Sequence, residues 1–451
     1  LDVSGAGALI NLNMLTSDLH DQIAMLKHAD SIGIDLKYIE LGEEFYLGDE
    51  EADTSLVLGR YPTAASYGDT AAIWIDSLRK YFPDAKFAVQ GIFDKSIDPR
   101  KLTWNESVTS HVTNEDAMTF HYYYASAVGD SAETDAEKLD VNYGDMPDMF
   151  YQPFKAWDLF QDNGLAQLPP GKEAWVTEYN LSDHIRPIHG TWASGLYTAL
   201  HTMQMLQDER ITHVNLHGVS GQAVFGALFY DTYGYNFGLL PGAHYVGPAT
   251  QPMTDAWGLT AYGNTMSMMG NALDGKMYAS KMNFSPNPQV MVIEKGDTFY
   301  YDGLFGYFFS DASHSQAIIL NLTDTVQKIK TTVMFPQGGS YEMRYADVIK
   351  LVAVASDVTI TNKSSLPDNL NLKPYSITRI SANTVPPPPP AASLTANGPT
   401  TFCEGDSVQL NAGSGYSQHI WSTGSTKQKI WVKETGDYWV HEYKEDGGYY
   451  A

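Results

Sequence analysis

Two short segments of the chain each place glutamate directly after an apolar strand. Residues 36–41 are predicted to form a short buried strand, and a glycine, Glu43 and Glu44 follow it. Residues 173–177 form a second apolar strand that ends at Glu178. In a parallel α/β barrel, the carboxyl ends of different strands build the active site. The sequence therefore predicts that glutamates from both segments meet in one pocket.

A pair of carboxyl groups in one pocket can cleave a glycosidic bond. Retaining cleavage needs two carboxyl groups roughly 5 Å apart, one that protonates the leaving oxygen and one that attacks the anomeric carbon. Glu44 and Glu178 are the catalytic candidates. Two further strands, at 86–92 and 117–122, lie between theirs in the chain, so Glu178 follows the third strand after that of Glu44.

The elements that must position these residues alternate between strand and helix. Apolar strands begin near residues 8, 36, 86, 117, 173 and 212, with helical patterns between them. Among these, a helix at about 63–81 is expected to turn Ile73, Trp74 and Leu78 inward, and a last helix at about 254–269 closes the series. Near-continuous apolar strands alternating with helices predict a parallel sheet covered by helices. A closed barrel has eight strands, so we expect either two units upstream of Leu1 or an open sheet.

The pattern changes after the last helix. Short strands separated by turns follow one another, which predicts an antiparallel β-sandwich. Five consecutive prolines, Pro386–Pro390, predict a stiff spacer, and a smaller module of short strands follows. The predicted domains are an N-terminally truncated (β/α) barrel at 1–275, the β-sandwich at 276–383, a proline-rich linker at 384–392 and an immunoglobulin-like domain, also expected to be cut short, at 393–451.

Composition excludes several classes of partner. The chain has 451 residues, with 28 basic and 53 acidic side chains and a net charge of −25. Nucleic acids and anionic membranes bind clustered Lys and Arg, so neither is expected as a partner. The chain contains no run of 18 apolar residues, so no membrane span is predicted. The single cysteine, Cys403, excludes a disulfide within the chain and a cysteine-based metal cage. We expect no cofactor and no metal, and the oligomeric state is not predicted.

The two glutamate segments resemble glycoside hydrolase clan A. The resemblance rests on Leu41-Gly-Glu-Glu44 and Trp175-Val-Thr-Glu-Tyr179, and it extends over roughly residues 1–382. The trailing sandwich is similar to that of the arabinofuranosidase and glucuronidase-like branches. The resemblance implies an acid/base after strand four and a nucleophile after strand seven, which would make Glu44 the acid/base and Glu178 the nucleophile. It also implies that strands one and two precede Leu1.

The resemblance further implies the residues around this pair. Strand six of the clan carries a tyrosine or histidine that contacts the nucleophile, and His121 or Tyr123 occupies that place here. His217, after the last strand, is expected to line the pocket, whereas a zinc site formed with His213 is not expected. The C-terminal module resembles those that trail secreted bacterial enzymes that degrade polysaccharides, which implies a secreted or cell-surface protein.

One residue departs from the pattern of the clan. The clan places Asn before the acid/base, and Glu43 stands there in this chain. An ionised carboxylate only accepts hydrogen bonds, whereas an amide also donates them. Glu43 is therefore expected to contact the substrate differently, and it leaves open which of the two adjacent glutamates is the acid.

The sequence thus predicts a retaining glycoside hydrolase that acts on a plant or algal polysaccharide or its oligosaccharides. The alternative is a non-catalytic carbohydrate-binding or adhesive surface protein built on a degenerate hydrolase barrel. Glu43, which replaces the Asn of the clan, is the residue that favours this alternative. A purely structural surface protein is a further alternative. Glu43 and Glu44 also lie near other acidic residues, so a solvated acidic loop or a loose calcium site is the simplest non-catalytic interpretation of that segment.

Overall fold

The computed structural model of the chain describes most of the region up to residue 382 and parts of the C-terminal region. The described residues are 7–48, 54–94, 98–128, 141–182, 188–218, 226–230, 257–276, 278–311, 314–350, 352, 357–382, 394–401, 405–414, 418–421, 423, 425–433, 438, 440–443 and 449–450. The predicted linker at 384–392 and Cys403 lie outside these residues. The chain divides into two compact units, and the first comprises Leu1–Ser131, Met149–His184 and Gln204–Val219.

A parallel six-stranded sheet forms the centre of the first unit. Its strands lie side by side in the order of the sequence, as successive strands of a (β/α) barrel do. All five neighbouring pairs are parallel. The strands are β1 (Leu9–Leu12), β2 (Tyr38–Leu41), β3 (Lys86–Gly91), β4 (Ala117–Tyr124), β5 (Glu173–Leu181) and β6 (Ile211–Leu216).

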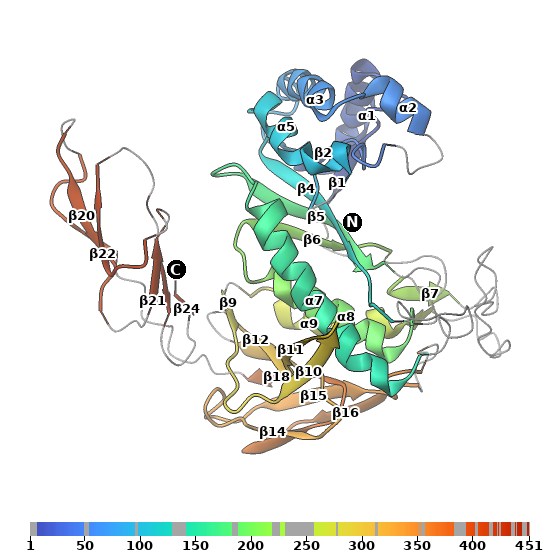
Figure 1. Cartoon of the computed structure of the whole chain (residues 1–451), viewed down its shortest axis with the longest axis vertical. Coiled ribbons are helices and arrows are strands. Elements are labelled where there is room, and N and C mark those ends of the chain that lie inside the picture. Colours follow the sequence, from blue (N-terminus) through green and yellow to red (C-terminus); the bar gives the residue numbers. More distant parts are fainter. Residues whose placement is uncertain are drawn as a thin grey trace. The chain divides into compact units, whose positions relative to one another are not determined.

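Helices connect these strands. They are α1 (Leu19–Ser31), α2 (Thr54–Arg60), α3 (Ala64–Leu78), α4 (Pro99–Leu102), α5 (Trp104–His111) and α7 (Met146–Phe160), the last of which begins in the second unit. Helices α3 and α5 pack against each other and against β3, and Figure 1 shows them with α1 and α2 in the blue part of the chain.

The structure confirms most of the inward-facing side chains predicted for helix α3. Its N-terminus is closed by a capping box between Thr63 and Ser66. Trp74 is 4% exposed and Leu78 is fully buried, as predicted. The prediction for Ile73 is wrong, because this side chain is 63% exposed. Residues four apart share a helix face, whereas adjacent residues point about 100° apart, so the face that carries Trp74 and Leu78 leaves Ile73 outside.

The second unit comprises Ala132–Asp148, Ile185–Met203 and Ser220–Ala451. It contains most of α8 (Trp192–Met205), all of α9 (Ala261–Leu273), and a six-stranded antiparallel sheet in the order β16-β15-β18-β13-β12-β9. These strands are β9 (Tyr278–Lys281), β12 (Leu304–Ser310), β13 (Ser315–Asn321), β15 (Ser340–Tyr345), β16 (Thr359–Lys363) and β18 (Ser376–Ala382). Two-stranded pairs join β7 (Leu228–Tyr230) with β8 (Trp257–Leu259), and β10 (Gln289–Glu294) with β11 (Asp297–Asp302).

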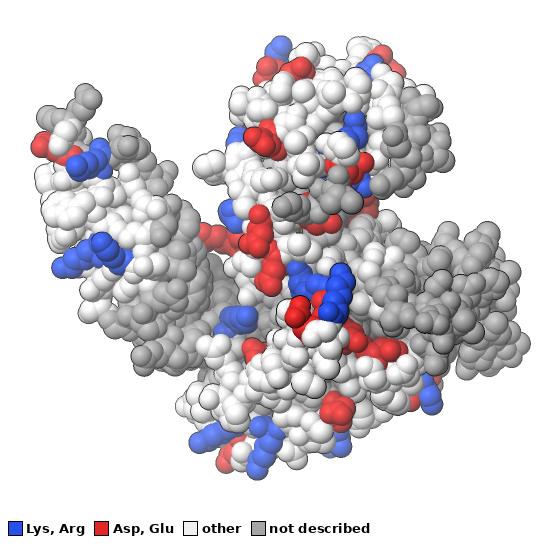
Figure 2. Space-filling model, in the orientation of Figure 1, with Lys and Arg blue, Asp and Glu red and all other residues white. Residues whose placement is uncertain are grey.

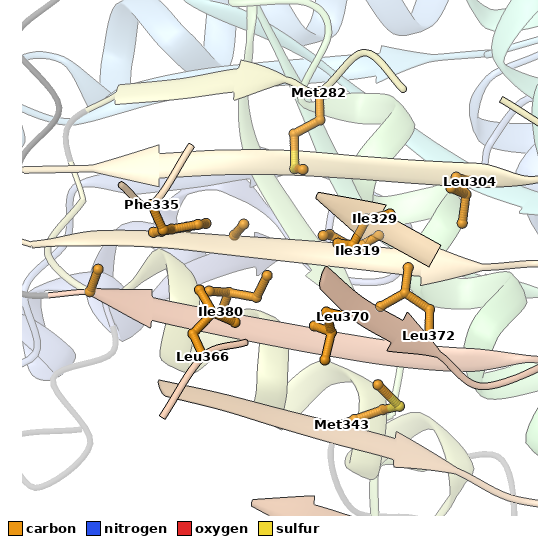
Figure 3. Close-up of a cluster of buried hydrophobic side chains, with 12 residues drawn as sticks. Met282, Leu304, Ile319, Ile329, Phe335, Met343, Leu366, Leu370, Leu372 and Ile380 are labelled. Carbon is orange, nitrogen blue, oxygen red and sulfur yellow. The ribbon is translucent and has the colours of Figure 1, made fainter. Parts of the chain in front are cut away.

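A second antiparallel layer packs on the six-stranded sheet. The strands β14 (Gln327–Lys330) and β17 (Asn369–Leu372) form a two-stranded sheet. Their side chains Ile329, Leu370 and Leu372 are buried against Ile319 and Ile380 of the larger sheet, as Figure 3 shows. Two antiparallel layers that share one apolar core are the arrangement of a β-sandwich.

Two three-stranded antiparallel sheets form the C-terminal part of the chain. One contains β19 (Thr395–Asn397), β20 (Val408–Asn411) and β22 (Lys429–Val432), and the other β21 (Gln418–Trp421), β23 (Val440–Tyr443) and β24 (Tyr449–Tyr450). Their shared core surrounds Trp421, which is 1% exposed. The all-β character is as predicted, and the assignment to the immunoglobulin-like class stays a prediction.

The predicted fold class, a parallel α/β sheet followed by antiparallel β-sheets, is confirmed. Several elements differ from the predictions. Strand β5 continues to Leu181, so Glu178 lies inside it and not after it. Helix α2 was not predicted, and the last helix starts at Ala261. The predicted domain boundaries stay predictions.

Surface charge and helix hydropathy are the remaining properties of the described residues that concern possible partners. The face seen in Figure 2 carries acidic and basic side chains near one another, the mixed pattern of a solvated surface. No helix within the described ranges combines the length and the apolar character needed to cross a membrane.

Candidate active site

A strained turn after β2 presents the adjacent glutamates. Gly42 has a φ of +79°, and a Cβ there would lie 2.4 Å from a ring carbon of Phe45. Only glycine fits this position without displacing that ring. Glu44 itself has a φ of +49°, a left-handed conformation that costs a non-glycine residue on the order of 1 kcal/mol. The surrounding contacts must therefore hold Glu44 in place.

Side chains from three other segments provide these contacts. The Arg100 guanidinium donates hydrogen bonds of 3.0 and 2.7 Å to the carbonyl oxygen of Phe45. The Gln90 side chain accepts a 2.8 Å hydrogen bond from the Phe45 backbone amide. The Asn11 amide donates to the carbonyl oxygen of Gly42 at 3.0 Å. These bonds fix the turn on both sides of Glu44 and stabilise its strained conformation.

An irregularity in the pairing of β4 and β5 sets the second half of the site. The register shifts after Phe120, so His121 pairs with Glu178 and Thr177 is bypassed. Strand residues two apart share a face of the sheet, and a bulge resets that alternation. As a result, Thr177 and Glu178, although adjacent, both reach side chains on the face that carries His121.

His121 lies between the two candidate catalytic carboxylates. Its Nδ1 atom is 2.8 Å from Oε1 of Glu44 and 3.6 Å from Oε2 of Glu178. Both distances start at the same nitrogen, so the two oxygens are no further apart than these two distances added together. The two carboxylates therefore lie close enough to act on one sugar ring, as a catalytic pair requires.

Glu178 has two further partners at the same oxygen. The Tyr123 hydroxyl donates a 2.8 Å hydrogen bond to Oε2, and Nδ1 of His217 lies 2.9 Å from that atom. Tyr123 and His217 also contact each other. The structure therefore brings together four predicted residues, Glu44, His121, Tyr123 and Glu178, with His217 beside them.

Electrostatics place a proton on His121 at neutral pH. Burial by itself would lower the pKa of this imidazole. The hydrogen bond to Glu44 and the negative charges of Glu178 and Glu40 outweigh burial and raise the pKa to about 9. A protonated imidazole has two N–H donors, so Nδ1 donates to Glu44.

The two adjacent glutamates have opposite shifts. Burial would raise the pKa of Glu44, but hydrogen bonds from His121 and from the Tyr46 hydroxyl, at 3.1 Å, lower it overall. The Glu43 residue is exposed, yet partial enclosure of its carboxyl and then the charge of Glu178 raise its pKa. In the free protein, Glu44 is therefore ionised and the neighbouring proton resides on His121.

A cavity of about 500 Å³ opens beside Glu43 and Glu44. Its wall comes from the end of β1, the turn after β2 and one residue of α2, and it includes Asn11, Asn13, Met14, Glu43, Glu44 and Val57. This volume is within the ~300–1,000 Å³ of ligand pockets in proteins. The cavity therefore has room for a substrate group next to Glu44.

Sequence reasoning missed one charged residue of the site. Glu40, inside β2, is 3% exposed and accepts a hydrogen bond from the Thr177 hydroxyl at 3.3 Å. Its Oε1 atom is 3.8 Å from Nε2 of His121. A carboxylate within an otherwise apolar strand is the signal that could have found it, because such groups are rarely buried without a partner.

Other candidate ligands are explained by packing and capping. The His213 ring packs on Tyr38 and Trp175, with ring centroids 4.2 and 5.0 Å away, while His217 contacts Glu178. Within the described residues, one group could offer three metal ligands, namely the exposed Asp18, His20 and Asp21. The Asp18 carboxylate caps α1 by accepting from the Asp21 amide, which accounts for this group.

Comparisons with known proteins place the fold. No family model matches the chain, and no curated protein sequence matches it. An α-L-arabinofuranosidase of family 51 from Bifidobacterium longum superposes with a TM-score of 0.58 at 13% identity, over 85% of this chain and 77% of that one. The family 51 enzyme from Thermotoga petrophila gives 0.52 at 16% identity, over 84% and 76%. The α-L-arabinofuranosidase from Thermotoga maritima gives 0.52 at 14%, over the same shares. The chain therefore has the fold of the family 51 arabinofuranosidases, as its resemblance to clan A implied.

Proposed function

We propose that the chain is a retaining glycoside hydrolase in which Glu178 is the nucleophile and Glu44 the acid/base. The single observation that carries this proposal is the position of His121, whose Nδ1 lies 2.8 Å from one carboxylate and 3.6 Å from the other. Retaining glycosidases hold their two carboxyl groups about 5–5.5 Å apart, and two carboxylates that share one imidazole nitrogen support such a pair.

In the first step, Glu178 attacks the anomeric carbon. The Tyr123 hydroxyl and His217 both contact Oε2 of Glu178, so Oε1 is the oxygen that forms the covalent bond. Burial, followed by the charge of Glu178, raises the pKa of Tyr123 far above its ordinary value. The phenol therefore remains protonated and fixes the nucleophile as a hydrogen-bond donor.

The proton for the leaving group comes from the pair formed by His121 and Glu44. The charge of Glu178 helps to hold the proton on His121, and that charge is lost as Glu178 bonds to the sugar. The proton then passes from Nδ1 to Glu44 over 2.8 Å and on to the glycosidic oxygen. In the second step Glu44 accepts a proton from water, which displaces Glu178.

The fold of the chain and the sequence resemblance support a substrate class. The neighbours with this fold are described as arabinofuranosidases, and the proposed substrate is a plant or algal polysaccharide or its oligosaccharides. Polymers of this kind occur outside the cell, so we also propose that the protein is secreted or displayed on the cell surface. The test is a panel of aryl glycosides, including the α-L-arabinofuranoside, with the anomer of the first product followed by NMR. Turnover with retention supports the proposal, and turnover with inversion contradicts it.

One observation favours the alternative, a carbohydrate-binding protein without catalysis. The pKa of Glu44 is lowered, whereas the general acid of a glycosidase usually has a raised pKa. Binding of oligosaccharides by calorimetry, with no turnover of any glycoside in the panel, would establish this alternative in place of hydrolysis.

Glu43 provides a test of how the site contacts its substrate. We expect Glu43→Gln to lower kcat/KM by about ten- to a hundredfold, mainly through KM, because a hydrogen bond to a charged acceptor contributes about 1.5–3 kcal/mol. The measurement is steady-state kinetics on the best glycoside of the panel. Glu106→Gln, an exposed glutamate on α5, is the matched control and should leave both constants unchanged. Equal kinetics for Glu43→Gln and the control would remove Glu43 from the binding site.

A further inference from the structure

One buried carboxylate has no part in the steps above. Glu40 lies on β2 and is 3% exposed. The Thr177 hydroxyl donates a hydrogen bond to it at 3.3 Å. A buried carboxyl group is costly unless its partners compensate for the loss of water. Its place inside the sheet therefore calls for a partner that benefits from a charge or a hydrogen-bond acceptor there.

His121 is that partner. Oε1 of Glu40 lies 3.8 Å from Nε2 of the imidazole, while Oε1 of Glu44 lies 2.8 Å from Nδ1. The two carboxylates thus approach different nitrogens of one ring. At 3.8 Å the contact is an electrostatic attraction and not a hydrogen bond. Without this charge near Nε2, one of the attractions that favour the observed orientation of the ring about its Cβ–Cγ bond is lost.

We propose that Glu40 is a positioning residue, which holds the imidazole of His121 so that Nδ1 faces Glu44 and Glu178. The consequence for turnover rests on the proposed hydrolase function, whereas the orientation of the ring does not. Glu40 acts through His121 and need not touch the substrate.

The charges that act on His121 come from several segments. Glu44 follows β2 and Glu178 belongs to β5, and both approach Nδ1; Glu40 alone of these three approaches Nε2. Glu43 beside Glu44, Tyr46, Tyr123 and His217 are the other titratable groups of this cluster. Burial raises the pKa of Glu40 to about 7, and that of His121 is about 9. Between these pH values both groups are charged and attract each other.

The test measures the His121 ring directly in the full chain. Histidine labelled with ¹³C at Cε1 gives one resonance for each of the 13 histidines, and loss of one resonance in His121→Asn assigns it. In Glu40→Gln we expect the pKa of His121 to fall by about one unit or more, as for any ionised group that loses an opposite charge at about 4–6 Å. Glu115→Gln, a glutamate 2% exposed that pairs with Lys172, is the matched control and should leave the His121 titration unchanged.

A second variant keeps the test decisive if Glu40→Gln does not fold. Thr177→Val removes the 3.3 Å hydrogen bond to Glu40 and retains side-chain volume, so Glu40 ionises less readily and the pKa of His121 should fall by a smaller amount. An unchanged His121 titration in either folded variant overturns the proposal.

Turnover separates this proposal from the proposed function. If the wild type hydrolyses a glycoside, Glu40→Gln should lower kcat about ten- to a hundredfold with little change in KM, because bound substrate still meets Glu44 and Glu178. If the His121 titration and the turnover of Glu40→Gln both match those of the wild type, the positioning role of Glu40 is contradicted and the hydrolase function is not. A clear NMR shift without any wild-type turnover contradicts the hydrolase function and leaves the positioning role standing.

Discussion

Replacing Glu178 by glutamine is expected to lower kcat/KM for every glycoside that the wild type cleaves by about 10⁴-fold or more. Glutamine has the shape of glutamate and still accepts the hydrogen bond from Tyr123, but its neutral amide cannot displace the leaving group. The measurement is initial-rate kinetics on aryl glycosides at matched protein concentration. Thermal unfolding should show a folded protein, because the side chain is replaced by one of equal size.

Glu173→Gln is the control for this prediction. Glu173 lies on the same strand, and its carboxylate contacts Lys86, Trp175 and Thr212. The variant removes a charge from β5 without touching the cluster, so turnover should stay near that of the wild type. Turnover by Glu178→Gln within tenfold of the wild type would exclude Glu178 as the nucleophile.

Replacing Glu44 by alanine is expected to have an effect that depends on the leaving group. A leaving group that needs protonation should lose about 10²–10⁴-fold in kcat/KM, the usual contribution of a general acid. A phenol that leaves readily without a proton should lose far less in the first step. Azide should restore turnover of such substrates by entering the space of the missing carboxylate and forming a glycosyl azide.

The pH profile gives the second readout for Glu44. The pKa of His121 is raised to about 9, so the shared proton is present below that pH and is lost as the pH rises through it. Wild-type kcat/KM should therefore fall on the alkaline side near pH 9. The apparent pKa of this fall belongs to the His121–Glu44 pair and not to either residue by itself. The fall should disappear in Glu44→Ala with an activated aryl glycoside. An unchanged alkaline fall in that variant would assign the titration to another group.

The periodicity of apolar residues predicted the elements of the fold well. The strands of the parallel sheet and the helix at Ala64–Leu78 follow from patterns that each segment carries by itself. Errors occurred where one segment permits two choices. Ile73 and Trp74 are both apolar neighbours on α3, and packing against β3 and α5 decided which of them is buried.

The site was predictable in membership and not in geometry. Glu44 and Glu178 could be identified because each follows or ends an apolar stretch, and the strand order then places them at one edge of the sheet. The register shift after Phe120 could not be predicted, because β4 and β5 are buried on both faces and carry no hydrophobic alternation that a shift would interrupt. Glu40 was missed although a carboxylate within an apolar strand is a signal in the sequence, and the folded sheet adds that Thr177 and His121 contact it.

The proposed roles of the two carboxylates also differ in what the sequence could indicate. The resemblance to clan A suggested Glu44 as the acid, but it did not indicate where the proton resides. That depends on the 2.8 Å contact with His121, which lowers the pKa of Glu44 and raises that of His121 against the opposite effect of burial on each. Both follow from the approach of separate strands in three dimensions.

The most direct measurement is to trap the covalent intermediate. A 2-deoxy-2-fluoro glycoside with a reactive leaving group, chosen from the sugar that the wild type turns over, slows the second step more than the first. After proteolysis, mass spectrometry should find the sugar on the peptide that contains Glu178, and Glu178→Gln should carry none. A sugar attached to Glu43, Glu44 or any other residue, or full turnover without a covalent adduct, would contradict the account.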